Sequence, residues 1–389
     1  LAPVLDVNMS AGNEVIGVRS FGDNPEMVAE LGASYIAGLQ SRRVSATAKH
    51  FPGHGGTIGN SHYQAIKVNS DLDTLRNADL KPFVYAIRGG VDAVMTAHVS
   101  MPKIDTSGLP ATLSHRIITG LLREELGFNG VVITDDMEMG AIAKDISIGQ
   151  AAVEAVLAGC DVITVVWTDK VKEDVYKALL SAVKKGVIKE SRIDESVRRI
   201  IAVKLKRKLL DDTPDADIEE VRRVVGNKLH QQISHLIAQK SITMVRNLNN
   251  VIPVNKDGEF AVISPFAYLS LELESYGIKN TQITVGVKMN KAQTNKIIKR
   301  ILKNDREVDA YIVAVVDDSQ ARLANILKHK TQKPVIVASL DSPYVYSSVR
   351  DADAYICAYS FRSQAIKALA KVITGESEAV GQLPVEIEN

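Results

Sequence analysis

The heptapeptide GVVITDD, at residues 130–136, combines the two features that decide how the first half of this chain folds. Its apolar and β-branched residues favour a strand, because such side chains pack well on a pleated surface. A short apolar run without alternation is typical of a strand buried on both faces, as in a parallel sheet. Two aspartates follow at once, so the sequence predicts a buried parallel strand that ends in carboxylates.

The same pattern recurs on both sides of this strand. Similar runs with polar ends lie at residues 2–8, 44–50, 92–98 and 161–166, and helical patterns separate them at 25–41, 71–88, 114–127 and 148–159. Strands that alternate with helices predict βα units and a parallel sheet, hence an α/β fold class. Polar strand ends are typical of the active-site face of a (β/α)₈ TIM-type barrel. Such a barrel has eight strands in roughly 250 residues, so we expect one that lacks its first units.

The length of 389 residues exceeds what a single core usually holds, which predicts two domains. We expect an N-terminally incomplete, barrel-like catalytic domain over residues 1–212, a helical linker region over 213–240 and a C-terminal α/β domain over 241–389. Apolar strand patterns at 260–265, 283–287, 310–316, 334–340 and 354–360 predict a layered sandwich in the last of these. It contains neither of the common glycine-rich nucleotide-binding motifs, so nucleotide binding has little support.

Charge and cysteine content disfavour several classes of protein. Lysine and arginine (47) nearly balance aspartate and glutamate (46), so no overall field favours nucleic acid or an anionic membrane. Cys160 and Cys357 lie in apolar surroundings, which predicts buried free thiols. No apolar run is long enough to span a bilayer. The chain opens inside the strand pattern LAPVLDVN, so we expect upstream sequence to be absent, and the lack of a signal peptide says nothing about compartment.

Residues 49–62, KHFPGHGGTIGNSH, are a second stretch suited to chemistry. Lys49 and His50 end a strand, from which they can donate hydrogen bonds to a neutral polyol. His62 ends a glycine-rich connector and titrates near neutrality, so it can deliver and retrieve a proton. A zinc site is disfavoured, because the H-x3-H-x7-H spacing lacks a helical pair and a cysteine ligand. A purely structural role for the histidines stays open.

Other polar positions allow two roles each. Asp135 can act as a nucleophile or a charge stabiliser, whereas one residue of the Asp135–Asp136 pair can instead cap the following helix. Arg19, shortly after the first strand, can hold substrate oxygens or pair with a carboxylate. His98, in TAHV, favours a structural or supporting role.

Six stretches, in this order, resemble the family 3 glycoside hydrolases, and most closely the bacterial β-N-acetylglucosaminidase (β-hexosaminidase) branch. They are APVLDVN (2–8), VIGVRSFG (15–22), AKHFPGHG (48–55) with SH (61–62), MTAHV (95–99), LPATLS (109–114) and VVITDDMEMGAI (131–142). The ending GESEAVGQLPVEI (375–387) also resembles that family's second domain. The resemblance therefore covers the first half closely and the second half more loosely.

The resemblance implies a retaining exo-hydrolase that removes terminal β-linked N-acetylglucosamine, often from peptidoglycan fragments. Asp135 matches the family's nucleophile, and His62 matches the general acid/base of this branch, where most retaining glycosidases use a second carboxylate. Arg19, Lys49 and His50 match residues that hold sugar hydroxyls. No metal or organic cofactor is implied, and the expected partner is a glycan rather than nucleic acid. By analogy with wall-associated members, an extracytoplasmic location is favoured over a cytoplasmic one, and the oligomeric state stays open.

Two departures from the family pattern support an alternative. The branch usually has an aspartate two positions before the catalytic histidine, and this chain has Asn60 there. An aspartate would orient the imidazole and stabilise its protonated form, whereas asparagine supplies no charge. The family's upstream acidic sugar-binding motif (D-Q-E-G-G-like) is also absent from this chain. The alternative is a degenerate, catalytically weak member that acts as a carbohydrate-binding or scaffolding module.

Overall fold

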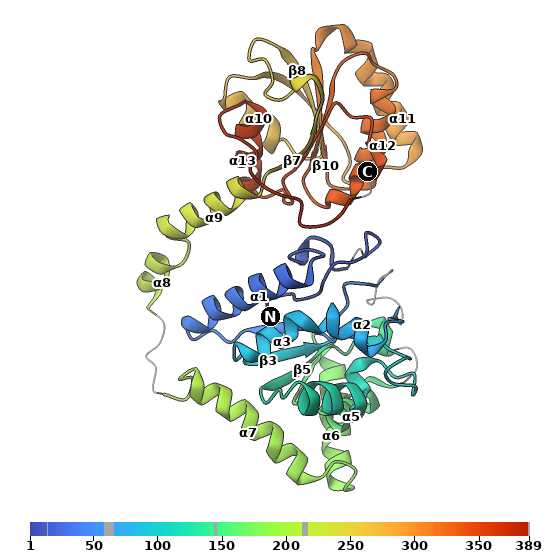
Figure 1. The fold of residues 1–389 in the computed structure, drawn as a ribbon, viewed down its shortest axis with the longest axis vertical. Helices are drawn as coiled ribbons and strands as arrows, with labels where there is room; N and C mark the ends of the chain where they lie inside the picture. The colour runs from blue at the N-terminus through green and yellow to red at the C-terminus, as the bar shows by residue number, and fades with distance from the viewer. Residues whose placement is uncertain (14, 58–65, 144–145, 212–216, 388–389) are drawn as a thin grey trace. The chain divides into compact units, whose positions relative to one another are not determined.

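The computed structural model describes residues 1–13, 15–57, 66–143, 146–211 and 217–387. The chain divides into two compact units, Leu1–Pro214 and Asp215–Asn389 (Figure 1). Each unit has its own sheet and its own hydrophobic core. The predicted α/β fold class is confirmed for both units.

The sheet of the first unit contains parallel strands in the order β1-β3-β5-β6. Neighbours in the sheet are therefore successive βα units along the chain. Val4 forms a further parallel bridge to Lys49 in β1, which places the segment 2–8 beside that edge. The strands are β1 (Thr47–Phe51), β3 (Ala93–Thr96), β5 (Val131–Asp136) and β6 (Val162–Thr164), and a separate parallel pair is formed by β2 (Ile66–Lys67) and β4 (Val99–Ser100).

This sheet is open within the described part of the chain. A closed barrel would need further strands between β6 and the edge beside Val4, and the described residues of this unit contain none. The (β/α)₈ barrel therefore stays a prediction. The spacing of apolar runs indicates βα units and their order, but closure depends on contacts between strands far apart in sequence.

Helices of the first unit begin where the sequence supplies caps. The Asn24 side chain accepts hydrogen bonds from the N–H groups of Glu26 and Met27, and Pro25 takes the first helical position of α1. The single helix predicted over 71–88 is two helices, which divide near Ala78. The helical elements are η1 (Gly17–Arg19), α1 (Pro25–Ser41), α2 (Leu72–Asn77), α3 (Leu80–Arg88), η2 (Ala111–Leu113), the π-helical η3 (Arg116–Glu125), α4 (Gly140–Ala143), α5 (Ile148–Ala158), α6 (Asp169–Lys184) and α7 (Glu190–Lys206).

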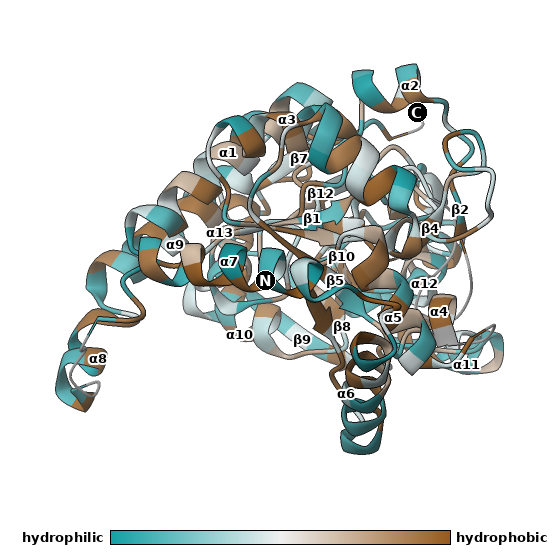
Figure 2. Ribbon diagram, turned by 90° about the horizontal axis from the view of Figure 1, so that it is seen from below, coloured by the Kyte–Doolittle hydropathy of each residue, from teal (hydrophilic) through white to brown (hydrophobic). Residues whose placement is uncertain are grey.

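The core of the first unit lies between the sheet and these helices. Leu5, Phe51, Val94 and Val132 are fully buried, and α1 packs beside α3 in Figure 1. In Figure 2 the lower turns of α6 are teal, which marks hydrophilic residues. None of the helices in the described ranges is both long and apolar enough to cross a membrane.

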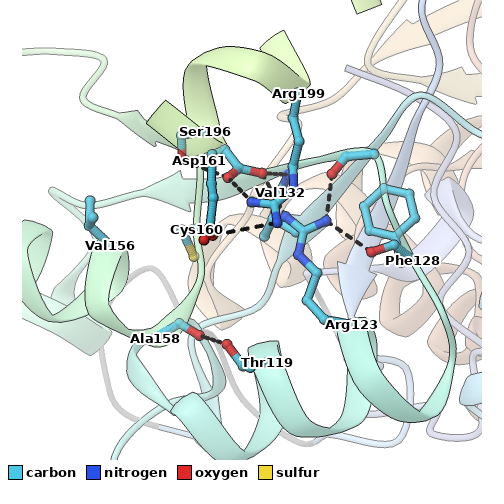
Figure 3. Close-up of polar contacts among 12 residues, drawn as sticks. Thr119, Arg123, Phe128, Val132, Val156, Ala158, Cys160, Asp161, Ser196 and Arg199 are labelled. Carbon is cyan, nitrogen blue, oxygen red and sulfur yellow. Dashed lines mark hydrogen bonds and ion pairs between the residues drawn. The ribbon is translucent and has the colours of Figure 1, made fainter. Parts of the chain in front are cut away.

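At the amino edge of this sheet, the carboxylate of Asp161 is fully buried among cations (Figure 3). Its Oδ2 accepts a hydrogen bond from Arg123 at 2.6 Å, and its Oδ1 accepts one from Arg199 at 2.9 Å. The Ser196 hydroxyl donates to Oδ1 at 2.6 Å, and the Val132 N–H donates to Oδ2 at 3.0 Å. One carboxylate thus links η3 and α7 to strand β5 and to the start of β6.

The second unit contains a sheet in the order β7-β12-β11-β10-β8-β9, with helices on both faces. Alternate residues of β8 and β10 face two separate cores, one under α9, α10 and α13 and the other under α11 and α12. The strands are β7 (Thr243–Asn247), β8 (Glu259–Ser264), β9 (Lys279–Thr284), β10 (Ala310–Val315), β11 (Val335–Ser339) and β12 (Ala354–Cys357). The helical elements are α8 (Ile218–Val224), α9 (Lys228–Ser241), η4 (Leu248–Asn250), α10 (Tyr268–Ser275), α11 (Lys291–Ile301), η5 (Leu302–Glu307), α12 (Asp318–Lys328), η6 (Pro343–Ser348) and α13 (Ser363–Ile373).

Two strands of this unit differ from the sequence prediction. The antiparallel edge strand β7 has no counterpart in it, because TMVRN is only partly apolar and partly exposed. The strand predicted at 283–287 is found at Lys279–Thr284, an edge strand with exposed polar positions. Edge strands bury less surface, so their apolar pattern is weaker.

Candidate active site

Polar side chains converge at the carboxyl edge of the first unit's sheet. Asp6 follows the bridge at Val4, Lys49 and His50 lie in β1, and Asp135 lies at the end of β5. Parallel strands end at the same edge, which explains how residues so far apart in sequence meet. This is the edge on which the sequence places the active site.

Asp6 and His50 form a deeply buried polar pair in the site. The His50 Nδ1 lies 2.7 Å from Asp6 Oδ2, and the backbone N–H groups of His50 and His54 donate to Asp6 Oδ1 at 3.2 and 2.8 Å. The carboxylate of Asp6 is fully buried. Burial raises the pKa of Asp6, but the charge and hydrogen bonds of His50 outweigh it and hold that pKa below its ordinary value. Asp6 therefore stays an anion that only accepts hydrogen bonds.

Asp135 faces the other side of the same imidazole. Its Oδ2 lies 3.9 Å from His50 Nε2, and its side chain is 27% exposed, so a ligand can reach it. Its Oδ1 accepts a hydrogen bond from the Asp136 N–H at 2.8 Å, which fixes the direction of the carboxylate. The arrangement presents an accessible oxygen beside a buried imidazole.

Lys49 contributes positive charge near Asp135, and Arg19 lies near enough to Lys49 for their charges to interact. Burial and the charge of Arg19 lower the pKa of Lys49, while Asp135 and Asp6 act in the opposite sense. The Arg19 guanidinium is exposed, and its Nε and Nη2 donate to the Val15 carbonyl oxygen at 2.9 and 2.6 Å. Lys49 thus interacts electrostatically with both Arg19 and Asp135, and His50 lies 3.9 Å from Asp135. Such cations suit the hydroxyl oxygens of a sugar.

The adjacent residues Asp135 and Asp136 take different roles. Asp136 Oδ1 accepts hydrogen bonds from the backbone N–H groups of Glu138 and Val166 at 3.2 and 3.3 Å, so Asp136 holds the turn after β5. The His98 Nε2 lies 3.0 Å from the Asp136 carbonyl oxygen, and its Nδ1 lies 2.8 Å from the Thr112 hydroxyl. Burial lowers the pKa of His98, which favours a neutral ring. His98 therefore supports the strand end, as the sequence favours.

The start of the glycine-rich loop is fixed by contacts that the sequence pattern did not indicate. The Asn13 amide is buried and donates to the carbonyl oxygens of His54 and Gly55 at 2.7 and 3.1 Å. A Cβ on Gly55 would lie 1.8 Å from the Val7 carbonyl oxygen, so the close approach of these backbones requires glycine. The sequence pattern pointed to Asp6, because a polar residue at the end of a predicted strand marks the active-site edge. No pattern pointed to Asn13.

His62 and Asn60 lie outside the described residues, so the predicted acid/base and its neighbour keep the roles that the sequence gives them. Within the described ranges, no group of three or more His, Cys, Asp or Glu side chains is arranged to hold a metal ion. Arg19, Lys49, His50 and Asp135 are therefore the predicted site residues whose positions are known.

Asp79, another residue without a sequence signal, packs under the loop. It is 3% exposed, and a Cβ on Gly53 would lie 2.5 Å from the Asp79 Cβ. Burial, together with the charge of Asp6, raises the pKa of Asp79 to about 7. Its folded pKa is raised, so the stability it contributes is complete below pH ~4, the ordinary range of an aspartate, and is lost as pH rises through about 7.

We expect Asp79→Asn to remove this pH dependence. The unfolding free energy of the variant relative to wild type should rise by about 2–4 kcal/mol between pH 4 and pH 8. Urea unfolding across that range measures the difference. Asp73→Asn is the control, because the Asp73 side chain is 91% exposed and should leave the curve unchanged. If the unfolding free energies of wild type and Asp79→Asn changed in parallel with pH, the raised pKa of Asp79 would be contradicted.

Comparison with known proteins places this chain in a family. The family description "Glycosyl hydrolase family 3 N terminal domain" matches residues 1–203. Beta-hexosaminidase A of Pseudoalteromonas piscicida is 30% identical over 446 residues, which cover 100% of this chain and 73% of that protein. A beta-hexosaminidase of Stenotrophomonas maltophilia is 43% identical over 176 residues, 45% of this chain and 51% of that protein, so the match spans about half of that relative.

A solved structure gives the same result over the whole chain. The glycoside hydrolase family 3 beta-N-acetylglucosaminidase from Paenibacillus sp. str. FPU-7 superposes with a TM-score of 0.93 and 36% sequence identity. The superposition covers 100% of this chain and 76% of that one. The chain therefore belongs to the family 3 glycoside hydrolases.

Proposed function

We propose that this protein is a retaining exo-β-N-acetylglucosaminidase in which Asp135 is the nucleophile. The observation that carries the proposal is the position of Asp135 Oδ2, which is accessible and lies 3.9 Å from His50 Nε2 at the carboxyl edge of the sheet. The names of the relatives support the sugar, since two are beta-hexosaminidases and one is a beta-N-acetylglucosaminidase. The substrate class is a glycan with terminal β-linked N-acetylglucosamine, including peptidoglycan fragments.

The reaction we propose has two steps. Asp135 attacks the anomeric carbon and forms a covalent glycosyl-enzyme, while His62 gives a proton to the departing oxygen. His62, now neutral, then takes a proton from water, whose oxygen attacks the anomeric carbon and releases Asp135. Two inversions give net retention. In this proposal Arg19, Lys49 and His50 hold the sugar hydroxyls so that the carbon faces Asp135.

The test is hydrolysis of 4-nitrophenyl β-N-acetylglucosaminide by the purified chain. We expect release of 4-nitrophenol, and we expect NMR to show the β-anomer of the free sugar first. The matching β-glucoside and β-xyloside test whether the acetamido group is needed. Release of the α-anomer first would contradict the retaining mechanism, and faster hydrolysis of the glucoside would contradict the proposed sugar.

A specific observation favours a second candidate, a catalytically weak member that binds carbohydrate. Asn60 stands where the branch usually has an aspartate that orients the acid/base histidine. An asparagine in place of the orienting aspartate of a serine-protease triad lowers kcat about 10⁴-fold. A loop histidine is held less tightly, so we expect a smaller effect here.

We therefore expect Asn60→Asp to raise kcat by about 10- to 100-fold, because a restored carboxylate would orient and stabilise the protonated imidazole of His62. Steady-state kinetics with the aryl glycoside measure the change. His62→Ala in the Asn60→Asp background is the control and should abolish the gain. If wild type releases no 4-nitrophenol but Asn60→Asp does, the binding-module function is the better one.

A further inference from the structure

Among the described residues of the first unit, Asp6, Asp92 and Asp161 lie next to strands with carboxylates that are at most 1% exposed, and Asp6 is paired differently. Asp92 and Asp161 precede β3 and β6 at the amino edge, and each is neutralised by arginine or lysine side chains. Asp6 lies at the carboxyl edge, where His50 is its ion-pair partner. Within the described residues, no lysine or arginine forms an ion pair with Asp6. Asp6 therefore has an imidazole where Asp92 and Asp161 have guanidinium or ammonium groups.

The contacts of Asp6 determine which nitrogen of His50 faces the site. An ionised carboxylate only accepts hydrogen bonds, so the His50 Nδ1, 2.7 Å from Asp6 Oδ2, must carry a hydrogen. The opposite nitrogen, Nε2, then faces Asp135. The second oxygen of Asp6 accepts from the backbone N–H groups of His50 and His54, which fixes the backbone that carries the ring. Tautomer and ring direction are thus both set by one residue.

We propose that Asp6 is a positioning residue of the active site, which keeps His50 protonated at Nδ1 and directs Nε2 at the sugar beside Asp135. The distance of 3.9 Å between Nε2 and Asp135 Oδ2 is too long for a direct hydrogen bond, and in this tautomer Nε2 is an acceptor to which a sugar hydroxyl beside Asp135 can donate. Asp6 touches no reacting atom and acts only through His50. A carboxylate that orients an imidazole from behind is a general device for fixing its tautomer.

The first experiment measures no enzymatic activity, so its result does not depend on the proposed function. Long-range ¹H–¹⁵N NMR of the full chain shows which ring nitrogens of each histidine carry hydrogen. The chain has 8 histidines, and His50→Ala identifies the His50 signals by their loss. We expect Nδ1 of His50 to be protonated. A His50 ring protonated only at Nε2 would overturn the proposal, even if Asp6 variants failed to fold.

The second experiment rests on the proposed function and uses a double-mutant cycle. Asp6→Asn keeps an oxygen for the two backbone N–H groups, but its amide N–H₂ donates toward Nδ1 and reverses the tautomer. We expect Asp6→Asn and His50→Ala each to lower kcat/KM by about 10- to 100-fold. The double variant should be no slower than His50→Ala alone, because Asp6 acts through His50.

Asp92→Asn is the matched control, since it also removes a buried carboxylate but at the opposite edge of the sheet. It should lower stability and leave kcat/KM per folded molecule unchanged. If the losses of kcat/KM in Asp6→Asn and His50→Ala added up in the double variant, Asp6 would not act through His50 and the proposal would be overturned. If wild type and Asn60→Asp both release no 4-nitrophenol, the proposed function fails, while the NMR result still decides the role of Asp6.

Discussion

Asp135→Ala is expected to lower kcat/KM for 4-nitrophenyl β-N-acetylglucosaminide by about 10⁴- to 10⁶-fold, the range seen when a covalent nucleophile is removed. The alanine leaves no atom able to bond to the anomeric carbon from the end of β5. If Arg19, Lys49 and His50 hold the sugar as proposed, KM should change much less than kcat. The expected loss therefore lies in the chemical step.

The control is the neighbouring residue. Asp136 accepts hydrogen bonds from the backbone N–H groups of Glu138 and Val166, and Asp136→Asn keeps an oxygen for them. We expect Asp136→Asn to stay within about tenfold of wild type, since it loses charge but no bond-forming group. Equal losses in the two variants would indicate that the turn after β5, and not the Asp135 carboxylate, limits the rate.

Azide makes the test specific for a nucleophile. In Asp135→Ala the azide anion can attack the anomeric carbon from the face that the carboxylate has vacated. The new carbon–nitrogen bond forms as the bond to 4-nitrophenolate breaks, which gives the α-glycosyl azide. We expect azide to restore release of 4-nitrophenolate from Asp135→Ala and to give no such product with wild type. Activity of Asp135→Ala near the wild-type level without azide would exclude Asp135 as the nucleophile.

The carboxyl edge of this site could be predicted from local patterns, because parallel strands end together. Each apolar run that ends in Asp6, His50 or Asp135 is visible in the sequence, and the sheet order brings those ends to one place. Residue types then indicate groups that can bind a polyol and transfer a proton, whereas the sugar is implied only by the resemblance to the family. The sequence pattern could not show which of Asp135 and Asp136 faces the site and which holds the turn. These roles depend on which backbone N–H groups lie near each carboxylate.

Other parts of the site depend on contacts that no local pattern contains. The pairing of Asp6 with His50 joins residues 44 positions apart, and the Asn13 contacts with the loop join residues 41 and 42 positions apart. Aspartate is usually a surface residue, and the burial that raises the pKa of Asp79 depends on its tertiary contacts. Closure of the sheet into a barrel requires its first and last strands to pair, and apolar runs alone do not predict such pairing.

The Asp161 network is a further long-range feature, and Asp161→Ala is expected to lower the unfolding free energy by about 3–5 kcal/mol. The side chains of Asp161 and Arg123 are 0% and 10% exposed, so the ion pair is well shielded from water. Burial lowers the pKa of Arg123, and the charge of Asp161 acts in the opposite sense. Without the carboxylate, the guanidinium stays buried with an uncompensated charge, which costs more than the pair itself contributes.

Urea unfolding followed by circular dichroism measures this loss, and three variants separate its causes. Asp161→Asn keeps an acceptor for Ser196 and Val132 and should lose less than Asp161→Ala. Asp161→Leu combined with Arg123→Leu removes the charges of this pair and should recover part of the loss, since replacing a buried pair by apolar side chains is often nearly neutral. Recovery should be incomplete, because Arg199 loses its partner as well, although its side chain is 25% exposed and keeps contact with water. A double variant less stable than Asp161→Ala would show that the hydrogen bonds of Arg123 to the carbonyl oxygens of Phe128 and Gly130, at 3.0 and 2.6 Å, matter more than its charge.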